Sequence, residues 1–488
     1  MKPLARFYET YNHRPVSYYN PLTGGMWSEI SKEHRLGSDA TLETAVAVCD
    51  TPVLYLLPNQ ANRYPARATW LQIPGVSLKK YLSKHQASEV LYQGKDINVY
   101  PIALWFDVRP GVTIKACVEA HRTLHTLVET HFQPQNVHQG NHETFPMEVL
   151  ATPGQLGLDL LRRTLPYGQE YPILPDEIAA ILVDEFGQGR SQFFEHGKDM
   201  IDQVYCYDGR WMYASCLRKV PTGPYIHDQV NEFMPYVSGF YLVRATVPAT
   251  WSHIGLLPCR AESDKYTQGG SYHNQPGHTF LSWCTSQELS LALKYGWSVQ
   301  VLERILWPET DKLPEPLKLW GERLVKLRET LVDKYPEPLR SLLRGAFRNI
   351  MLQAVGSFRR FSSEYDSYVT EVDMVPHGDV APLLEDGHYH YTTQNDLPPK
   401  QLQTFQPQWA DFIWGLARKK LAENALQLPY ESLVALRTDG IWATAEHTFN
   451  DTGKVGQLRP KQLAQSTCLP WPKSLSEYLK FLVITRVY

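Results

Sequence analysis

Apolar residues recur along the chain at two spacings, one typical of amphipathic helices and the other of strands. Six segments place apolar residues three or four positions apart, which predicts helices over residues 114–131, 154–163, 174–186, 317–333, 339–358 and 409–425. Short runs rich in β-branched and aromatic residues predict strands over residues 202–207, 240–247 and 298–305. The mixture of the two patterns predicts an α+β fold.

Two of the predicted helices are joined by a short break that contains prolines. Lys334-Tyr-Pro-Glu-Pro338 separates residues 317–333 from residues 339–358, and proline does not continue a helix. The two segments are therefore expected to form an antiparallel helical hairpin, with arginines along it.

A second hairpin, made of strands, is predicted further along the chain. Asp439-Gly440 separates the apolar segments 432–436 and 441–445, and Asp-Gly between β-forming residues is a strong turn signal. Residues 361–400 form an expected insertion with two short strands. Residues 1 to about 145 mix apolar runs with the first predicted helix, which predicts a small α/β module.

The composition is that of an ordinary globular protein, with 43% hydrophobic and 20% charged residues. A net charge of −3 excludes a uniformly basic coat but is compatible with local basic grooves. The seven cysteines include no C-x-x-C pair, so we expect reduced thiols in a cytoplasm-like compartment, without a zinc site or disulfides. The chain shows neither a signal-peptide pattern nor about 18 consecutive apolar residues, so no membrane span is expected.

Two aspartates occupy positions suited to metal-dependent chemistry. Asp208 follows the predicted strand 202–207, and Asp439 lies in the turn of the predicted β-hairpin. Nucleotidyl transfer uses two divalent cations, and carboxylates fixed on strand ends and turns supply the hard oxygen ligands that magnesium prefers. Either aspartate alone is more often a cap or a turn former, so the surrounding motifs decide between the interpretations.

The motifs around Asp208 resemble those of the family B DNA polymerases. Residues 186–190 (FGQGR) resemble the family's glycine-rich Y-x-G-G-R element. Residues 207–213 (YDGRWMY) fit the first catalytic motif, D-x-x-S-L-Y-P. In this match Asp208 takes the metal-binding position, and Tyr213 takes the position of the tyrosine under the incoming sugar.

Later segments match the family's motifs in the same order. Residues 436–440 (LRTDG) resemble the third motif, Y-x-D-T-D-S, with Asp439 at its second aspartate and Arg437 in place of its first. Residues 348–356 (RNIMLQAVG) are in register with the second motif, K-x-x-x-N-S-x-Y-G, although Arg348 replaces the lysine and only the glycine is retained. Further family elements are matched by residues 254–260, 277–296 and 454–459.

The resemblance implies a set of site residues and partners. Two Mg²⁺ or Mn²⁺ ions would be held by Asp208 and Asp439. The expected nucleotide-binding residues are Met212, Tyr213, Arg328, Arg344 and Arg348. The expected nucleic-acid-binding residues are Gly189, Arg190, Lys454 and Arg459. The implied partners are a DNA primer-template and dNTPs. The arginines of the helical hairpin have a second interpretation, as solvated helix faces with ion-pair partners nearby.

The resemblance also implies a right-hand polymerase fold. This fold has an antiparallel-sheet palm, helical-hairpin fingers, a short thumb and a small α/β N-terminal domain. The expected boundaries are 1–150 for the N-terminal module (a degenerate or replaced exonuclease), 151–310 and 401–460 for the palm, 311–360 for the fingers, 361–400 for the insertion, and 461–488 for the short thumb.

Two departures from the family shape the expected function. Residues 1–150 are short for a proofreading exonuclease, and neither Asp50 nor Asp107 begins the Asp-x-Glu pair with which that domain opens. We therefore expect proofreading to be absent. Few residues follow Lys454, so a short thumb implies weak processivity or a protein partner that compensates for it.

The sequence thus predicts a DNA-directed DNA polymerase that adds dNTPs to a 3′ hydroxyl by two-metal catalysis. Its expected setting is the cytoplasm, as the enzyme of a prokaryotic host, a virus or a mobile element. Two alternatives stay open. The altered second motif and the 361–400 insertion favour an untemplated or protein-primed nucleotidyltransferase. A catalytically silent, nucleic-acid-binding scaffold with the same fold is the other.

Overall fold

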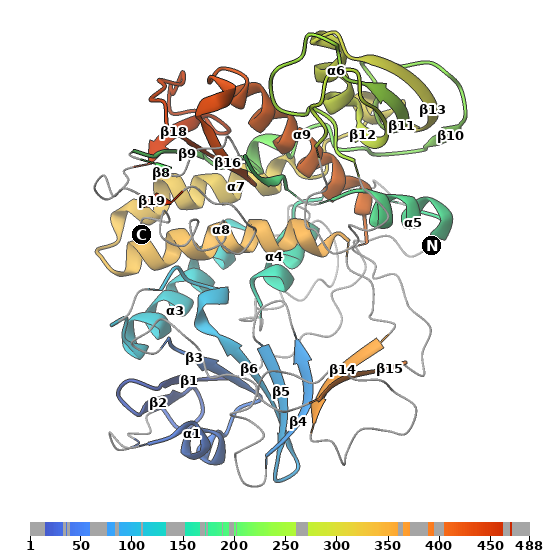
Figure 1. Cartoon of the computed structure of the whole chain (residues 1–488). Helices are drawn as coiled ribbons and strands as arrows, with labels where there is room; N and C mark the ends of the chain where they lie inside the picture. Colours follow the sequence, from blue (N-terminus) through green and yellow to red (C-terminus); the bar gives the residue numbers. More distant parts are fainter. Residues whose placement is uncertain are drawn as a thin grey trace. The chain divides into compact units, whose positions relative to one another are not determined.

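The structure of the protein is a computed structural model of the whole chain (Figure 1). One compact unit comprises Pro166–Gly321 and Gln406–Tyr488, and a second unit comprises Lys2–Leu165 and Glu322–Phe405. The chain therefore enters each unit twice. The residues that the structure describes are 15–32, 36, 40–58, 76–82, 87–108, 111–132, 152–165, 171, 174–187, 189–194, 200–201, 203–259, 272–359, 365–370, 389–394, 405–461 and 469–470.

The first unit contains a five-stranded antiparallel sheet in the order β18-β9-β17-β16-β7. Its strands are β7 (Ser191–Phe193), β9 (Tyr205–Gly209), β16 (Leu433–Arg437), β17 (Gly440–Ala443) and β18 (Leu458–Lys461). The predicted β-hairpin is confirmed, since β16 and β17 pair across a two-residue turn. Pairing with β17 and β18 extends β9 through Asp208, which the sequence placed just beyond the strand.

A second antiparallel sheet in this unit has the strand order β10-β13-β11-β12. These strands are β10 (Ile226–Asp228), β11 (Ser238–Thr246), β12 (Thr279–Thr285) and β13 (Ser298–Trp307). Helix α6 (Ser286–Lys294) begins directly after β12 with a capping box, in which Thr285 and Glu288 satisfy each other's backbone N–H groups. Helix α9 (Pro407–Ala425) packs on α6 and on α5 (Asp176–Glu185). A short pair joins β8 (Met200–Ile201) to β19 (Leu469–Pro470).

The second unit is built on a six-stranded sheet in the order β2-β1-β3-β6-β5-β4. Neighbours β1, β3 and β6 run parallel, and the other pairs are antiparallel. The N-terminal region thus combines a mixed sheet with helices. The strands are β1 (Val16–Asn20), β2 (Gly25–Ser28), β3 (Val53–Leu56), β4 (Val76–Leu82), β5 (Ala87–Tyr92) and β6 (Lys95–Pro101).

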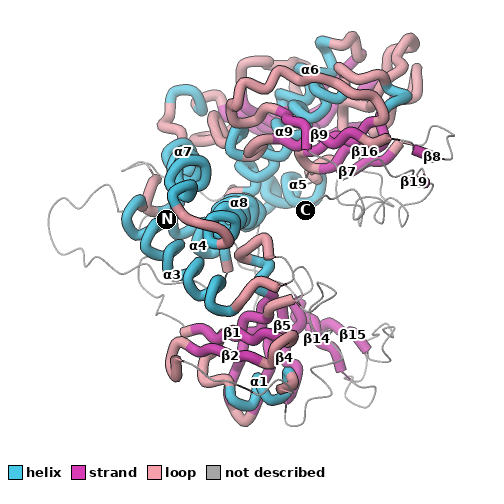
Figure 2. Tube along the Cα trace, turned by 90° about the vertical axis from the view of Figure 1, so that its left-hand side faces the viewer, coloured by secondary structure: helices cyan, strands magenta, loops and turns pink. Residues whose placement is uncertain are grey.

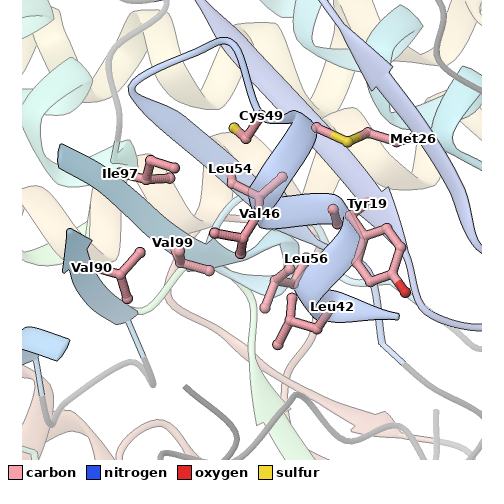
Figure 3. Close-up of a cluster of buried hydrophobic side chains, with 11 residues drawn as sticks. Tyr19, Met26, Leu42, Val46, Cys49, Leu54, Leu56, Val90, Ile97 and Val99 are labelled. Atoms are coloured by element: carbon pink, nitrogen blue, oxygen red, sulfur yellow. The ribbon is translucent and has the colours of Figure 1, made fainter. Parts of the chain in front are cut away.

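Helices cover both faces of this sheet. Helix α1 (Leu42–Val48) packs its apolar face on one side, where Leu42 and Val46 join Leu54 and Ile97 in a fully buried cluster (Figure 3). Burying such side chains is the main favourable term in folding. On the other side, His121 of α3 (Ile114–His131) packs on the tyrosine rings of β1 and β3.

Helices α3, α4 (Pro153–Arg162) and α8 (Leu339–Ser357) lie beside one another in the second unit (Figure 2). The approach of α4 to α8 depends on Gly157. A Cβ at that position would lie 2.6 Å from the Cβ of Ala354 and 2.8 Å from the carbonyl oxygen of Ile350. Gly157, within the predicted helix 154–163, therefore permits the close packing of α4 on α8.

Most predicted helices are confirmed to within a few residues. The predicted helix 317–333 is regular only over α7 (Lys318–Lys326), after which a π-turn (Leu327–Leu331) and a 3₁₀ turn (Val332–Lys334) follow. The two strands expected in the insertion are present as the antiparallel pair β14 (Tyr365–Thr370) and β15 (Tyr389–Gln394). Further 3₁₀ turns are Ile102–Leu104, Ala214–Cys216, Thr310–Lys312 and Tyr430–Ser432. Among the described residues, no helix is both long and apolar enough to cross a membrane.

Candidate active site

Asp208 lies near the end of β9, which has a partner strand on each side. The register places Gly440 of β17 opposite it on one side and Arg459 of β18 on the other. Directly opposed residues in a sheet project to the same face, so Asp208 and Arg459 share a face. The Asp208 side chain is half-exposed, which leaves its carboxylate accessible to a ligand from solvent.

Asp439 lies in the two-residue turn between β16 and β17. Thr438 begins this turn with a φ of 51°, and its hydroxyl donates to Asp439 Oδ1 at 3.0 Å. The backbone N–H of Gly209 donates to the Asp439 carbonyl oxygen at 2.8 Å. Because Gly440 is opposite Asp208, the two aspartates are one residue out of register on neighbouring strands. Ordinary sheet spacing then places their Cα atoms roughly 6–7 Å apart.

Both carboxylates act electrostatically on one buried thiol. Burial is the main reason why the pKa of Cys206 is raised to about 12. The charge of Lys461 lowers this pKa, and the charges of Asp208 and Asp439 raise it. The two aspartates therefore lie close enough to the same group to influence its titration. The thiol therefore stays protonated at neutral pH.

The donor set fits divalent cations of the magnesium type. Asp208 and Asp439 offer hard oxygen ligands on adjacent parts of one sheet. Within the described ranges, no group of three or more His, Cys, Asp or Glu side chains could hold a metal ion. Magnesium commonly takes one or two carboxylates and completes its octahedral shell with water and substrate phosphates. Two carboxylates are therefore a sufficient contribution from the protein.

The glycine-rich segment before β7 packs against the turn that carries Asp439. The backbone N–H of Thr438 donates to the Arg190 carbonyl oxygen at 2.6 Å. A Cβ on Gly189 would lie 3.0 Å from Thr438 Cγ2 and 3.2 Å from the Tyr213 hydroxyl. Glycine at position 189 thus permits three segments to approach closely. The structure brings Gly189 and Tyr213 to the turn of Asp439, and their roles in binding nucleic acid and nucleotide stay predictions.

The chain reverses direction directly after β9. Trp211 adopts a φ of 52°, and the following Met212 is fully buried. The Met212 side chain packs on Gly209, where a Cβ would lie 2.9 Å from the methionine Cε. The Met212 carbonyl oxygen accepts a hydrogen bond from the Ser215 hydroxyl at 2.5 Å. This packing fixes the backbone on which Tyr213 is carried, and a role of the Met212 backbone in nucleotide binding remains a prediction.

Arg190 is not accessible to nucleic acid, so this part of the sequence prediction is wrong. Its side chain is only 1% exposed. The guanidinium donates from Nη1 to the Gly255 carbonyl oxygen at 2.9 Å and from Nε to Gln192 Oε1 at 3.0 Å. It also stacks 3.8 Å over the Tyr272 ring. Burial lowers the pKa of Arg190 to about 10, so it remains charged and anchors the glycine-rich segment.

A buried ion pair, which no sequence motif predicted, holds the other end of that segment. Arg418 of α9 donates to both carboxylate oxygens of Glu288 on α6, at 2.7 and 3.1 Å, and both side chains are nearly inaccessible. Arg418 Nη1 also donates to the Gly187 carbonyl oxygen at 2.8 Å. Burial lowers the pKa of Arg418, but the charge of Glu288 outweighs this, so the pKa lies above its ordinary value.

Residues 454–459, the basic segment after the β-hairpin, form a loop that leads into β18. Gln457 Oε1 accepts from the backbone N–H groups of Thr452 and Lys454, both at 2.9 Å, which shapes an exposed loop. The backbone of Arg210, just after β9, accepts from Gly456 N at 2.6 Å and donates to Gln457 O at 2.9 Å. Lys454 is exposed in this loop and Arg459 is half-exposed on β18. Both remain candidates for phosphate contact.

The arginines of the helical hairpin differ in their surroundings within the second unit. Arg344 donates to Asp333 at 2.7 Å, and Arg328 donates to Glu329 at 2.9 Å. These two therefore have the acidic neighbours expected of a solvated helix face. Arg348 is exposed and takes part in none of the ion pairs formed by the described residues. Contact of these three arginines with a nucleotide remains a prediction.

One face of the N-terminal sheet carries a row of aromatic residues. Trp27, Tyr18, Tyr55 and Tyr100 lie opposite one another across β2, β1, β3 and β6. Tyr55 accepts a hydrogen bond from Trp105 Nε1 at 2.8 Å. A catalytic exonuclease face would need carboxylates to hold metal ions. The described part of this face is packed with rings, and the charge of Glu29 acts on Tyr18 and Tyr55.

Comparisons with known proteins concern the family and the fold of the chain. Residues 189–315 match the family described as DNA polymerase type B, organellar and viral. No curated protein sequence matches the chain significantly. Phi29 DNA polymerase, in a ternary complex with primer-template DNA and incoming nucleotide substrates, has a similar fold, with a TM-score of 0.55, 13% identity, and coverage of 92% of this chain and 84% of that chain. Phi29 DNA polymerase complexed with single-stranded DNA gives a TM-score of 0.55, 13% identity and coverage of 94% and 87%.

The two kinds of comparison cover different parts of the chain. The family match includes Gly189, Asp208 and Tyr213, which are the residues that gather near the turn of Asp439. The likeness in fold extends over both halves of the sequence, including the N-terminal sheet. At 13% identity this likeness concerns the fold.

Proposed function

We propose that this chain, whose resemblance to the family B DNA polymerases is confirmed by the family match and by its fold, is a DNA-directed DNA polymerase without proofreading. The observation that carries the proposal is the register of β9, β17 and β18. This register puts Asp208 opposite Gly440, next to the turn that carries Asp439, and opposite the cationic Arg459. A carboxylate and a cation on one face, with a second carboxylate in the adjoining turn, suit a reaction between a 3′ hydroxyl and a triphosphate.

Asp208 and Asp439 are the proposed metal ligands. Two bound Mg²⁺ or Mn²⁺ ions would activate the primer hydroxyl and neutralise the triphosphate and its leaving group. The protein contributes rigidity, because β9 is paired on both sides and the Gly209 N–H holds the Asp439 carbonyl. Preorganised ligands of this kind need no rearrangement during the reaction.

Tyr213 and Gly189 are proposed to shape the place of the incoming nucleotide. Tyr213 is nearly buried, and its hydroxyl would lie only 3.2 Å from a Cβ at position 189, which is a tight contact. A ring held in this way can exclude a ribose 2′-hydroxyl by its bulk. Arg348, exposed on α8, is the proposed triphosphate contact of the fingers, since a guanidinium can bind phosphate in a bidentate manner.

Arg459 and Lys454 are proposed to contact the phosphates of the primer strand. Arg459 is the direct cross-strand neighbour of Asp208, so a primer end placed at the metal site would lie beside its guanidinium. Lys454 sits in the exposed loop that Gln457 holds in place. Contacts of this kind are independent of sequence and weaken as the salt concentration rises.

The division of labour in the chain is also proposed by analogy with the family. The first unit would contain the palm, and α7 and α8 the fingers. The N-terminal sheet would be an exonuclease-like module without exonuclease activity, because Tyr18, Tyr55 and Trp105 fill a face that would otherwise need carboxylates.

Primer extension on a DNA template with Mg²⁺ or Mn²⁺ and dNTPs tests the proposal. The wild-type chain should extend the primer and should not shorten it when dNTPs are left out. Asp208→Asn and Asp439→Asn should each lower extension by roughly three orders of magnitude, because each removes a charged metal ligand. Asp311→Asn is the matched control, since that exposed aspartate pairs only with exposed Lys219 among its described ion pairs.

Two results would contradict the proposal. One is an absence of incorporation by the wild-type chain with every template, primer and metal tried. The other is extension by the Asp208→Asn and Asp439→Asn variants at the rate of the Asp311→Asn control. Shortening of the primer by the wild-type chain would contradict the proposed lack of proofreading alone.

A further inference from the structure

Three charged residues lie in one row across the five-stranded sheet. Arg459 of β18 is opposite Asp208 of β9, Asp208 is opposite Gly440 of β17, and Gly440 is opposite Arg437 of β16. Residues opposed in this way project to one face. With neighbouring strands about 4.8 Å apart, the backbone of Arg437 is roughly 10 Å from that of Asp208.

Arg437 is free to act on this site through its charge. Its side chain is half-exposed, and neither Arg437 nor Arg459 forms an ion pair with any carboxylate of the described residues. The space above Gly440 is filled by an indole, since a Cβ there would lie 3.0 Å from the Trp442 ring. Trp442 is only 8% exposed, so the space between the charges on its two sides is occupied by an apolar ring, although the charged side chains themselves are half-exposed.

We propose that Arg437 is a specificity-determining residue that weakens the binding of free divalent cations at Asp208 and Asp439. This inference rests on the proposed function, because it takes these carboxylates as the metal ligands. Two guanidinium groups, Arg437 and Arg459, offset the formal charge of the two carboxylates. The face therefore attracts a free cation weakly, and the phosphates of a bound nucleotide restore the attraction.

The size of the effect follows from electrostatics. For a divalent cation about 10 Å from a unit charge, at a dielectric between that of a protein surface and that of water, Coulomb's law gives roughly a tenfold change in affinity. Arg437 also stands where the third family motif has an aspartate. A positive charge here in place of a negative one should weaken metal binding. This chain should therefore need a higher concentration of divalent cation than a site that has the aspartate.

Titration of the full-length chain with Mn²⁺, followed by electron paramagnetic resonance without DNA or nucleotide, tests the inference. Arg437→Gln should lower the dissociation constant about tenfold, and Arg437→Asp about a hundredfold. Arg437→Lys keeps the charge and should bind as the wild type does. Arg244→Gln is the matched control for the loss of an arginine, because Arg244 lies on β11 in the other sheet of the same unit. Circular dichroism of each variant checks that it is folded.

The outcomes separate this inference from the proposed function. Asp208→Asn is made in the Arg437→Gln background, where Mn²⁺ binding is strong enough to measure. Loss of binding there, together with tighter binding in Arg437→Gln alone, supports both proposals. Equal affinities of Arg437→Gln, Arg437→Asp and wild type, with binding still lost in the Asp208 variant, overturn the role of Arg437 only. Binding that does not depend on Asp208 overturns both.

Discussion

His121 is a buried histidine that the fold holds in its neutral form. It is 3% exposed and packs on Tyr18, Tyr55, Trp105 and Phe106. Tyr18 makes a short hydrogen bond to Nδ1, and Nε2 has no hydrogen-bond partner among the described residues. Burial lowers the pKa of His121 to about 3, because a charged imidazole would lose its hydration without gaining a counter-ion.

This histidine should make the second unit sensitive to acid. In the unfolded chain His121 titrates near 6.5, and in the folded chain near 3, so the unfolded state binds the extra proton between these values. Its contribution to stability is present above pH 6.5 and is lost as the pH falls, by about 2 kcal/mol at pH 5. Chemical denaturation at pH 7.5 and pH 5 measures it. The His121→Gln variant should lose about 2 kcal/mol less than the wild type between these pH values, and equal losses would contradict the account.

At the scale of single residues, sequence motifs indicated candidate charged and glycine residues of the site but not which side chains are buried. The motifs predicted Asp208 and Asp439 as metal ligands and Gly189 as a nucleic-acid contact, and these roles stay predictions. Arg190 was misplaced because its burial depends on Gly255 and Tyr272, which lie far from it in the sequence.

The buried pair Glu288–Arg418 links three elements of the first unit. Glu288 also caps α6 by accepting from the Thr285 backbone at 3.0 Å, and Arg418 of α9 reaches the Gly187 carbonyl. Through the glycine-rich segment, this pair is connected to the turn of Asp439. Such a pair is costly to break from one side, because the remaining charge is left buried without its partner.

Substitution of one partner should therefore destabilise the chain strongly. Arg418→Met or Glu288→Gln should each lower the free energy of unfolding by about 3–5 kcal/mol, whereas the double variant should recover part of this loss. The exposed pair Lys219–Asp311 is the control, and Lys219→Met should cost less than about 1 kcal/mol. Urea denaturation measures all four. Single losses at Glu288 and Arg418 as small as that of the control would show that the pair is not stabilising.

At the scale of elements, the length of a pattern decided what could be predicted. Long helices such as α3, α8 and α9 carry enough turns for their periodicity to be seen. Short strands such as β7 and β18 carry only a few residues, and their pairing partners β16 and β9 come from distant parts of the sequence. The sequence did not predict the π-turn at the end of the predicted helix 317–333, because the helical spacing of apolar residues continues through the π-turn.

At the scale of the whole molecule, the order of motifs was more informative than any one of them. The chain leaves the first unit after Gly321, passes through the second unit, and re-enters the first unit at Gln406. Only this return brings the segment around residue 439 back to the strand of residue 208. The net charge of −3 is compatible with DNA binding because the basic side chains Arg437, Arg459 and Lys461 gather on one sheet face. Composition alone could not have located that face.

Asp208 and Asp439 are proposed to hold a pair of divalent cations together. Crystals of the full chain grown with Mn²⁺, DNA and a non-reactive nucleotide allow the metal positions to be measured by anomalous scattering. We predict two manganese peaks roughly 3.5–4 Å apart, in contact with both carboxylates. Carboxyl groups more than about 8 Å apart, twice the separation of such a metal pair, or an absence of manganese between them, would contradict the account.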